Sequence, residues 1–359
     1  MVVTNTLTGP FFTGDFPDIA INSVSGKLSL NLTVNNISVL SENYYPDSSG
    51  YVAIRDLGEL LINYIDIPKL SATDNNYTLS PADVAMTLTD TSDTKSFSFK
   101  VYYSKCSVNF SPVAEARFFS RYKKIQTAEG RKEFISFLYT STLTFKIGVA
   151  YMSNGKPLYK RDNITIIATP IDVVAVNVSP AKIASICSVS AASILWYDLY
   201  LTDGNYQDTI RYNVDRNNHR LTHNFLYNNV FGMPENISFT GSSELNPAIT
   251  GDTVEILKNM QRIDAGYNNL QTLNTGYIDK AKYCALLDMI TSPHIISYDD
   301  DNITEVVITD IDFQHNRPSN EPIAVTLTYR PAKKNHHSFF RSAYSSNKIF
   351  DRSFDITFN

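Results

Sequence analysis

Apolar and polar residues alternate along most of this chain. The stretch 28–34 (LSLNLTV) places an apolar residue at every second position, which predicts a strand with one buried face. The same period returns at 85–89 and 96–103, around the turn-forming loop 90–93 (DTSD), and predicts a hairpin. Further hairpins are predicted around Asn154-Gly155, around 203–205 (DGN), and between 303–313 and 323–329. Short strands separated by turns are typical of antiparallel sandwiches or barrels, so the chain is predicted to be mainly β.

A helical period interrupts this pattern in two places. Asp56 and Glu59 resemble a capping box, and the apolar residues that follow share one face, which predicts a helix near 56–65. Asp279 can cap a second helix at 279–291, which ends before Ser292-Pro293. The stretch 113–124 is a weaker third candidate. Such short helices need tertiary packing, so we expect them to cover an open face or end of a sheet.

The length of 359 residues is sufficient for two or three domains. The softest boundary lies near 170–180, where a polar strand region gives way to a Ser/Ala-rich apolar segment. We therefore predict two antiparallel β-sandwich or barrel-like domains, 1–172 and 173–359, with two or three short covering helices. The tail at 331–359 keeps several phenylalanines and is a candidate for docking on a neighbour.

The composition and net charge of the chain exclude several classes of protein. The net charge of −5 argues against a nucleic-acid coat or a membrane-surface binder, and 43% hydrophobic residues exclude overall disorder. Cys106, Cys187 and Cys284 are too sparse for a disulfide framework or a zinc site and are predicted to be buried free thiols. The N-terminus lacks a signal peptide, and no apolar run reaches 18 residues, so we expect a chain made in a cytoplasm with no membrane contact.

Two groups of potential metal ligands match known metal-binding motifs only in part. His219 and His223 have the spacing of a zinc protease, but Arg220 stands where that motif needs Glu, and the asparagines around them favour a loop. The acidic run 299–302 (DDDN) lacks the Gly and Glu of a calcium loop and is better explained as a polar hairpin turn. We therefore predict no metal or cofactor.

One basic cluster interleaves with aromatic residues, a pattern that single-stranded nucleic-acid binding would also produce. An amphipathic helix with a charged outer face and an aromatic inner face is the favoured interpretation, since the chain as a whole is acidic. We predict no specific nucleic-acid binding. The cluster comprises Arg117, Arg121, Lys123, Lys124, Arg131 and Lys132, with Phe118, Phe119 and Tyr122 between them.

No catalytic motif occurs in the sequence, and we predict that the protein is not an enzyme. A carboxylate pair formed by distant segments would not be visible in the sequence. One weaker hypothesis is a polysaccharide-degrading enzyme that uses paired carboxylates such as Asp299 to Asp301 and Glu305.

Four segments, in this order, resemble tail proteins of phages and prophages of Bacteroidetes bacteria. The first is 11–19 (FFTGDFPDI), and the second is 44–50 (YYPDSSG) followed by a strand and the helix 55–61 (RDLGELL). The third is 225–235 (FLYNNVFGMPE). The fourth is 273–280 (LNTGYIDK), followed by a helix, by Ser292-Pro293-His294-Ile295 and by the closing hairpin. The resemblance implies a structural protein of the virion, similar to distal tail, baseplate-hub or adaptor proteins, without catalytic residues.

This resemblance leads to a functional hypothesis: a non-enzymatic component of the phage tail or baseplate that forms a ring and contacts other tail proteins. The candidate interface residues are aromatic and lie near both ends of the chain: Phe11, Phe12, Phe16, Phe339, Phe340, Phe350 and Phe354. Packing of these side chains on their own domain is the competing interpretation. The alternative function is a carbohydrate-binding β-sandwich module that contacts the host surface. The single tryptophan, Trp196, lies in an alternating run and is predicted to be in the core, which weakens this alternative.

Overall fold

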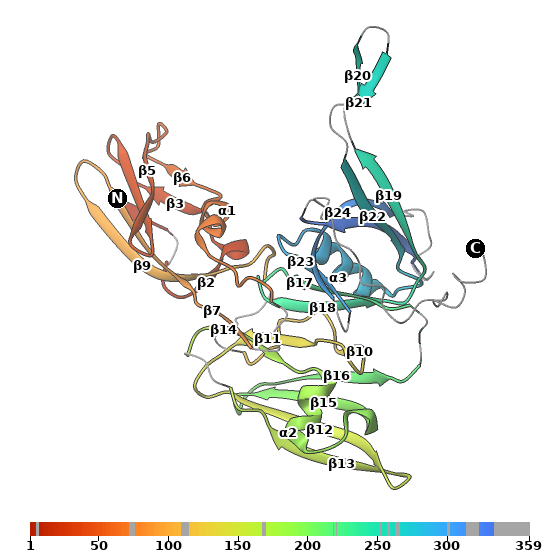
Figure 1. The fold of residues 1–359 in the computed structure, drawn as a ribbon. Helices are drawn as coiled ribbons and strands as arrows, with labels where there is room; N and C mark the ends of the chain where they lie inside the picture. Colours follow the sequence, from red (N-terminus) through yellow and green to blue (C-terminus); the bar gives the residue numbers. More distant parts are fainter. Residues whose placement is uncertain are drawn as a thin grey trace.

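The computed structural model describes residues 1–4, 7–71, 76–108, 115–166, 170–217, 219, 221–250, 253–256, 259–262, 266–299, 302–313 and 323–333. Strands dominate these residues, and three short α-helices accompany them, so the predicted mainly β fold is confirmed. The buried hydrophobic side chains form three clusters, which we call the first, second and third cores. Three groups of strands surround them (Figure 1).

The first core lies between a three-stranded and a five-stranded sheet. The smaller sheet has the order β1 (Val2–Val3), β3 (Ile19–Asn22), β6 (Val52–Ile54). The larger has the order β2 (Phe11–Phe12), β9 (Thr94–Tyr102), β8 (Ala82–Thr89), β4 (Leu28–Val34), β5 (Ile37–Tyr44). Strand β4 is the strand predicted at 28–34, and every second residue of it is buried. The hairpin predicted around 90–93 joins β8 to β9, and its turn is closed by the Asp90 N–H, which donates to the Asp93 carbonyl at 3.0 Å.

Two of the segments that carry the resemblance meet in this unit. Helix α1 (Leu57–Leu61) continues as the 3-10 helix η2 (Ile62–Tyr64), which confirms the helix predicted near 56–65. It packs on the 3-10 helix η1 (Thr13–Asp15) so closely that a Cβ on Gly58 would lie 2.1 Å from the Thr13 carbonyl oxygen. The Thr13 hydroxyl is itself fixed, because it donates to the Ser104 carbonyl (2.6 Å) and accepts from the Ser104 N–H (2.8 Å). Gly58 therefore permits a close contact between the two backbones, and Gly14 does the same in the first segment, where a Cβ would lie 2.2 Å from the Cys106 carbonyl oxygen.

The second core lies between a five-stranded outer sheet and a three-stranded central sheet. The outer sheet has the order β10 (Lys124–Ala128), β16 (Gln207–Asp215), β15 (Ile194–Thr202), β12 (Thr144–Ser153), β13 (Lys156–Asn163). The central sheet has the order β11 (Phe134–Leu138), β14 (Val173–Asn177), β7 (Tyr77–Leu79). Both hairpins predicted here are confirmed, since Ser153 pairs with Lys156 and Thr202 with Gln207. Helix α2 (Pro180–Cys187) and the 3-10 helix η3 (Ala191–Ser193) follow the central sheet and were not predicted.

The central sheet is shared between two cores. Along β11, Phe134 and Leu138 face the first core, whereas Ile135 and Phe137 face the second. A strand that is covered on both faces is apolar at nearly every position, as in the run FISFL. Strand pairing also crosses the boundary predicted between 172 and 173, because β14 pairs with β11 and β7, and β15 pairs with β12. The sheets thus enclose three hydrophobic cores, whereas the sequence predicted two domains.

The third core is built on a seven-stranded sheet covered by α3 (Lys280–Ile290). The strand order is β18 (Pro234–Phe239), β17 (His223–Asn228), β23 (Ile295–Tyr298), β24 (Ile303–Phe313), β25 (Val325–Pro331), β22 (Gly266–Asn274), β19 (Ser243–Thr250). The helix predicted at 279–291 is confirmed, and the Asp279 side chain accepts from the Lys282 N–H as an N-cap (2.7 Å). Strands β19 and β22 lead into a two-stranded extension, β20 (Thr253–Ile256) and β21 (Asn259–Arg262), which projects away from the rest of the molecule (Figure 1).

The weaker prediction of a helix at 113–124 is wrong for the residues that the structure describes, because 115–123 contain no helix. Their backbone bonds to strands instead: the Phe118 N–H donates to an Asp208 carboxylate oxygen (3.1 Å), and the Phe119 N–H donates to the Ser136 carbonyl (2.7 Å). The predicted burial of the aromatic side is confirmed for Phe118 and Phe119. In the part of the chain that the structure describes, no helix is long and apolar enough to cross a bilayer.

Candidate functional site

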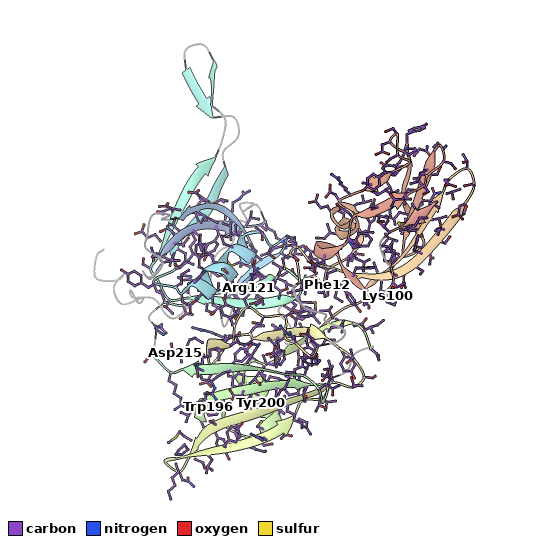
Figure 2. The ribbon with its side chains drawn as sticks, turned by 180° about the vertical axis from the view of Figure 1, so that it is seen from behind. Phe12, Lys100, Arg121, Trp196, Tyr200 and Asp215 are labelled. Carbon is purple, nitrogen blue, oxygen red and sulfur yellow. The ribbon has the colours of Figure 1, made fainter. Side chains whose placement is uncertain are left out.

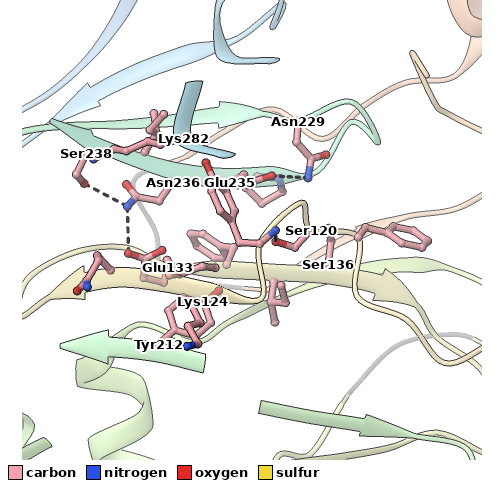
Figure 3. Close-up of a pocket in the computed structure, with 18 of the residues that line it drawn as sticks. Ser120, Lys124, Glu133, Ser136, Tyr212, Asn229, Glu235, Asn236, Ser238 and Lys282 are labelled. Carbon is pink, nitrogen blue, oxygen red and sulfur yellow. Dashed lines mark hydrogen bonds between the residues drawn. The ribbon is translucent and has the colours of Figure 1, made fainter. Parts of the chain in front are cut away.

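A cavity of about 390 Å³ lies where the second and third cores meet (Figure 3). One wall comes from β10 and β11, the opposite wall from β18, and the first turn of α3 closes one side. Its polar side chains include Glu133 immediately before β11, Glu235 and Asn236 on β18, and Lys282 on α3. We call it the junction cavity.

Glu133 is a buried acid without an ion-pair partner among the described residues. Burial raises its pKa from 4.5 to about 7, although Arg131 and the hydrogen-bonding side chains around it favour the charged form. The Asn236 amide nitrogen donates to a Glu133 carboxylate oxygen at 3.1 Å and lies 3.3 Å from the Ser238 hydroxyl. The Asn236 amide oxygen accepts from the Tyr298 hydroxyl at 2.7 Å. The amide group of Asn236 therefore connects the acid, through β18, to Tyr298 on β23.

Glu235 is the second acid of the cavity. Burial raises its pKa from 4.5 to about 7, and the charge of Asp288 acts in the same direction. The Asn229 amide nitrogen donates to one of its carboxylate oxygens at 3.1 Å (Figure 3). Asp288 in turn forms a two-pronged ion pair with Arg121, with distances of 2.7 and 3.0 Å.

Lys282 brings a cation to the same cavity. Burial, followed by the positive charge of Arg131, lowers its pKa from 10.5 to about 8. Its ammonium lies 5.2 Å from the centre of the Phe239 ring. Groups that titrate near neutrality can exchange protons at physiological pH. In this cavity both acids are bonded to asparagine side chains: the Glu133–Asn236 bond joins the start of the central sheet to β18, and the Glu235–Asn229 bond lies within the β17–β18 hairpin.

The sequence did not identify this pair of acids, because Glu133 and Glu235 stand 102 positions apart in ordinary strand patterns. The acids proposed from the sequence lie elsewhere. Asp299 closes the β23–β24 turn, where it exchanges hydrogen bonds with Asn302, which confirms the polar turn; Asp300 and Asp301 lie outside the described residues. Glu305 lies on β24, 3.8 Å from His294.

A second candidate surface covers the outer face of the outer sheet. Along β15, Tyr197, Leu199 and Leu201 point into the second core, so Trp196 and Tyr200 point to the opposite face (Figure 2). The expectation that Trp196 belongs to the core is therefore wrong. Neighbouring strands add three side chains to this face: Tyr159 and Arg161 from β13, and Arg211 from β16. We call these five side chains the platform.

Aromatic rings and guanidinium groups alternate across the platform. The Arg211 guanidinium lies 4.0 Å from the centre of the Trp196 ring and forms a two-pronged ion pair with Asp198. The rings of Tyr159 and Trp196 are 5.7 Å apart, and the hydroxyls of Tyr159 and Tyr200 are 3.3 Å apart. Burial, together with the neighbouring hydroxyl and carboxylate, raises the pKa of Tyr200, so it stays protonated. These contacts order a polar, aromatic surface.

The predicted interface residues near the N-terminus contact their own chain. Phe12 is only 5% exposed and lies against Phe119 and Phe231, at ring distances of 6.0 and 5.9 Å. Phe11 and Phe16 are partly buried, and their ring centres are 5.4 Å apart. This placement agrees with the competing interpretation, in which the segment packs on its own domain. The other candidates, Phe339, Phe340, Phe350 and Phe354, lie outside the described residues.

Three of the six residues of the basic cluster form ion pairs with nearby acids. Arg121 pairs with Asp288, Lys123 with Asp208, and Arg117 with Glu115. Arg131 is buried, and one of its terminal nitrogens donates to the Gln126 carbonyl at 3.2 Å. Most of these charges are thus committed to partners within the chain.

Neither the histidines nor the cysteines form a metal centre within the described ranges, where no group of three or more His, Cys, Asp or Glu converges. His219 bonds to the Asp215 carboxylate at 2.8 Å, whereas His223 begins β17. All three cysteines are free; Cys187 is buried, and Cys106 and Cys284 are partly buried.

Comparison with known proteins gives no family assignment. No family model matches the chain, and no curated protein matches it. Among solved structures, a tandem of titin immunoglobulin domains has 11% identity and a TM-score of 0.21, and the match covers 60% of this chain and 95% of that one. Extracellular domains 3–5 of Drosophila OTK have 7% identity and a TM-score of 0.22, with 84% and 94% covered. The four N-terminal immunoglobulin domains of Dscam1 have 10% identity and a TM-score of 0.17, with 82% and 69% covered. At TM-scores this low, the likeness carries no functional inference.

Proposed function

We propose that this chain is a non-enzymatic structural component of a phage particle, in the tail or baseplate region, where copies form a ring and connect to other tail proteins. It would be made in the cytoplasm of the host bacterium and end up in the virion. One observation supports this proposal above the others: a β-ribbon, formed by β19, β22, β20 and β21, projects from the third core (Figure 1).

The ribbon offers free backbone groups to another chain. Strand β19 pairs with β22 from Ser243↔Leu273 to Thr250↔Gly266 and is the last strand of its sheet. In the described part of the chain it has no second neighbour, so one row of its N–H and C=O groups is available for strand addition. A two-stranded ribbon is only marginally stable by itself in water. Docking on a neighbouring copy would complete its hydrogen bonds.

The rest of the fold suits a component that must hold its shape in an assembly. The central sheet packs against two cores at once, so turning the first and second cores relative to each other would expose apolar side chains that are now buried. The side chains of the junction cavity add hydrogen bonds to the third core. A rigid chain with one projecting ribbon is well suited to closed rings of identical copies.

The test shortens the ribbon and leaves the rest of the chain unchanged. Residues 245–271, which hold most of β19 and all of β20 and β21, are replaced by Asn-Gly, a two-residue hairpin turn that keeps the pairing of Glu244 with Thr272. We expect the variant to keep its circular dichroism spectrum and melting temperature but to lose self-association in light scattering and incorporation into particles. Tyr45→Ser, at an exposed site in the first unit, is the control and should assemble normally.

Electron microscopy of the parent particle, with the protein labelled, then locates it. Rings at a tail end that disappear with the shortened ribbon support the proposal. A protein that is absent from the particle contradicts the virion role. A shortened variant that assembles like the unmodified chain contradicts the role of the ribbon.

A further inference from the structure

We propose that the platform binds an acidic saccharide, with a pyranose ring packed on Tyr159 and its carboxylate paired with Arg161. This inference goes beyond the structural role, and neither depends on the other. It begins with the position of the Tyr159 ring, which is ordered and yet 44% exposed.

A glycine makes room for that ring. Gly148 lies on β12 between Asp198 of β15 and Arg161 of β13, in register with both. A Cβ at this position would lie 1.9 Å from the Tyr159 hydroxyl oxygen and 2.6 Å from the adjacent ring carbon. The phenol end of Tyr159 therefore extends across β12 toward Tyr200, and only a residue without a side chain permits this. The result is an aromatic surface that lies close to the sheet.

The charge of the platform selects the ligand. Asp198 is fully engaged by Arg211 through two hydrogen bonds of 2.7 and 2.9 Å. The Arg161 guanidinium lies 5.6 and 5.9 Å from the ring centres of Tyr159 and Tyr200, and within the described residues it forms no ion pair. Lys146, in register with Tyr200, adds a second exposed cation. The face thus carries two positive charges that are not neutralised within the described chain.

An acidic sugar satisfies both features. The C–H groups of a pyranose ring carry a slight positive charge and pack on the negative face of an aromatic ring. A uronate carboxylate matches the two-pronged geometry of a guanidinium, and such charge-assisted hydrogen bonds are stronger than neutral ones. Single-stranded nucleic acid could also stack and form ion pairs here. We favour the saccharide because the chain has a net charge of −5, which opposes the dense charge of a phosphate backbone.

The molecule contains its own reporter for this site. Trp196 is the single tryptophan of the chain, and it contacts Tyr159 on the platform. Its fluorescence is followed while the full chain is titrated with trigalacturonate, with maltotriose as the neutral sugar and with oligothymidylate as the nucleic acid. We expect a saturable change with trigalacturonate, at least tenfold weaker binding of maltotriose, and tenfold weaker trigalacturonate binding after Arg161→Gln.

Two further variants test the geometry. Tyr159→Ala removes the stacking ring, and Gly148→Ala displaces it while leaving every ring and charge in the sequence. Both should weaken trigalacturonate binding at least tenfold and keep the unmodified far-ultraviolet circular dichroism spectrum. Tyr206→Ala, at a 50% exposed tyrosine in the β15–β16 turn of the same sheet, is the matched control and should bind normally.

Several outcomes would overturn the inference. No saturable change with trigalacturonate, or unaltered binding after Tyr159→Ala, removes the site. Equal binding of maltotriose refutes the role of Arg161. Tighter binding of oligothymidylate would reassign the platform to nucleic acid.

Discussion

Replacing Glu133 by glutamine should make the protein more stable at alkaline pH and leave its stability at acidic pH almost unchanged. In the folded protein, burial raises the pKa of this carboxyl from 4.5 to about 7. An acid whose pKa is higher in the folded state favours folding while it is protonated. This contribution is complete below about pH 4.5 and is lost as the pH rises through about 7.

The magnitude follows from the same two pKa values. A difference of one pKa unit corresponds to about 1.36 kcal/mol, so ionising Glu133 in the folded protein costs up to about 3 kcal/mol at pH 8. A glutamine is neutral and can still accept, through its carbonyl oxygen, the hydrogen bond from Asn236. Glu133→Gln should therefore gain up to about 3 kcal/mol over the unmodified chain at pH 8 and almost nothing at pH 4.5.

Urea unfolding followed by circular dichroism at pH 4.5, 6, 7 and 8 measures this difference. Glu129→Gln, at an exposed glutamate in the adjoining β10–β11 turn, removes the same charge and should give a small difference that is nearly constant with pH. A Glu133→Gln variant that is less stable than the unmodified chain at pH 8 would refute the reasoning. It would mean that the carboxylate is charged and favourably paired in the folded state.

Three further predictions follow from particular contacts. Gly58→Ala should lower the free energy of unfolding by roughly 2 kcal/mol or more, the cost of overpacking, because the new Cβ would collide with the Thr13 backbone. Gly148→Ala should lower it less, because the new Cβ would meet the side chain of Tyr159, which can move. The opposite order in urea titrations would contradict this explanation. Asp279→Ala should cost about 1 kcal/mol in thermal melts through loss of the α3 cap, whereas an unchanged melting temperature would deny the cap any contribution. Deleting 338–359 should leave a folded chain that no longer assembles in light scattering; a truncated chain that aggregates or unfolds would place this tail in the core.

The parts of the fold that could be predicted are those fixed by neighbouring residues. The turn at Asn154-Gly155 and the cap at Asp279 act within a few positions, so local chemistry determines them. Alternation likewise located strands such as β4. It could not say which face of a strand is buried: on β15 both faces contain aromatic residues, and packing against the central sheet buries Tyr197 rather than Trp196.

What the sequence could not predict depends on pairing between distant segments. Strands β11 and β14 of the central sheet are buried at every position and have no two-residue period, so their sequences resemble a buried helix as much as a strand. The junction cavity forms only when β11 and β18 approach, so nothing near Glu133 marks it as a titrating group. The segment 115–123 has an amphipathic sequence, but its amide groups find partners on neighbouring strands instead of along a helix.

The composition of the first core has a consequence for how the chain is made. Most of that core is in place once Tyr103 has been translated, yet it also contains Leu226, Met233, Ile296 and Tyr298. At roughly 5 to 20 residues per second, the ribosome needs about 6 to 25 s to proceed from Tyr103 to Leu226. During that interval an apolar surface of the nascent chain stays uncovered. A chain that stops before Tyr298 therefore keeps part of the first core exposed and should aggregate more readily than the complete chain.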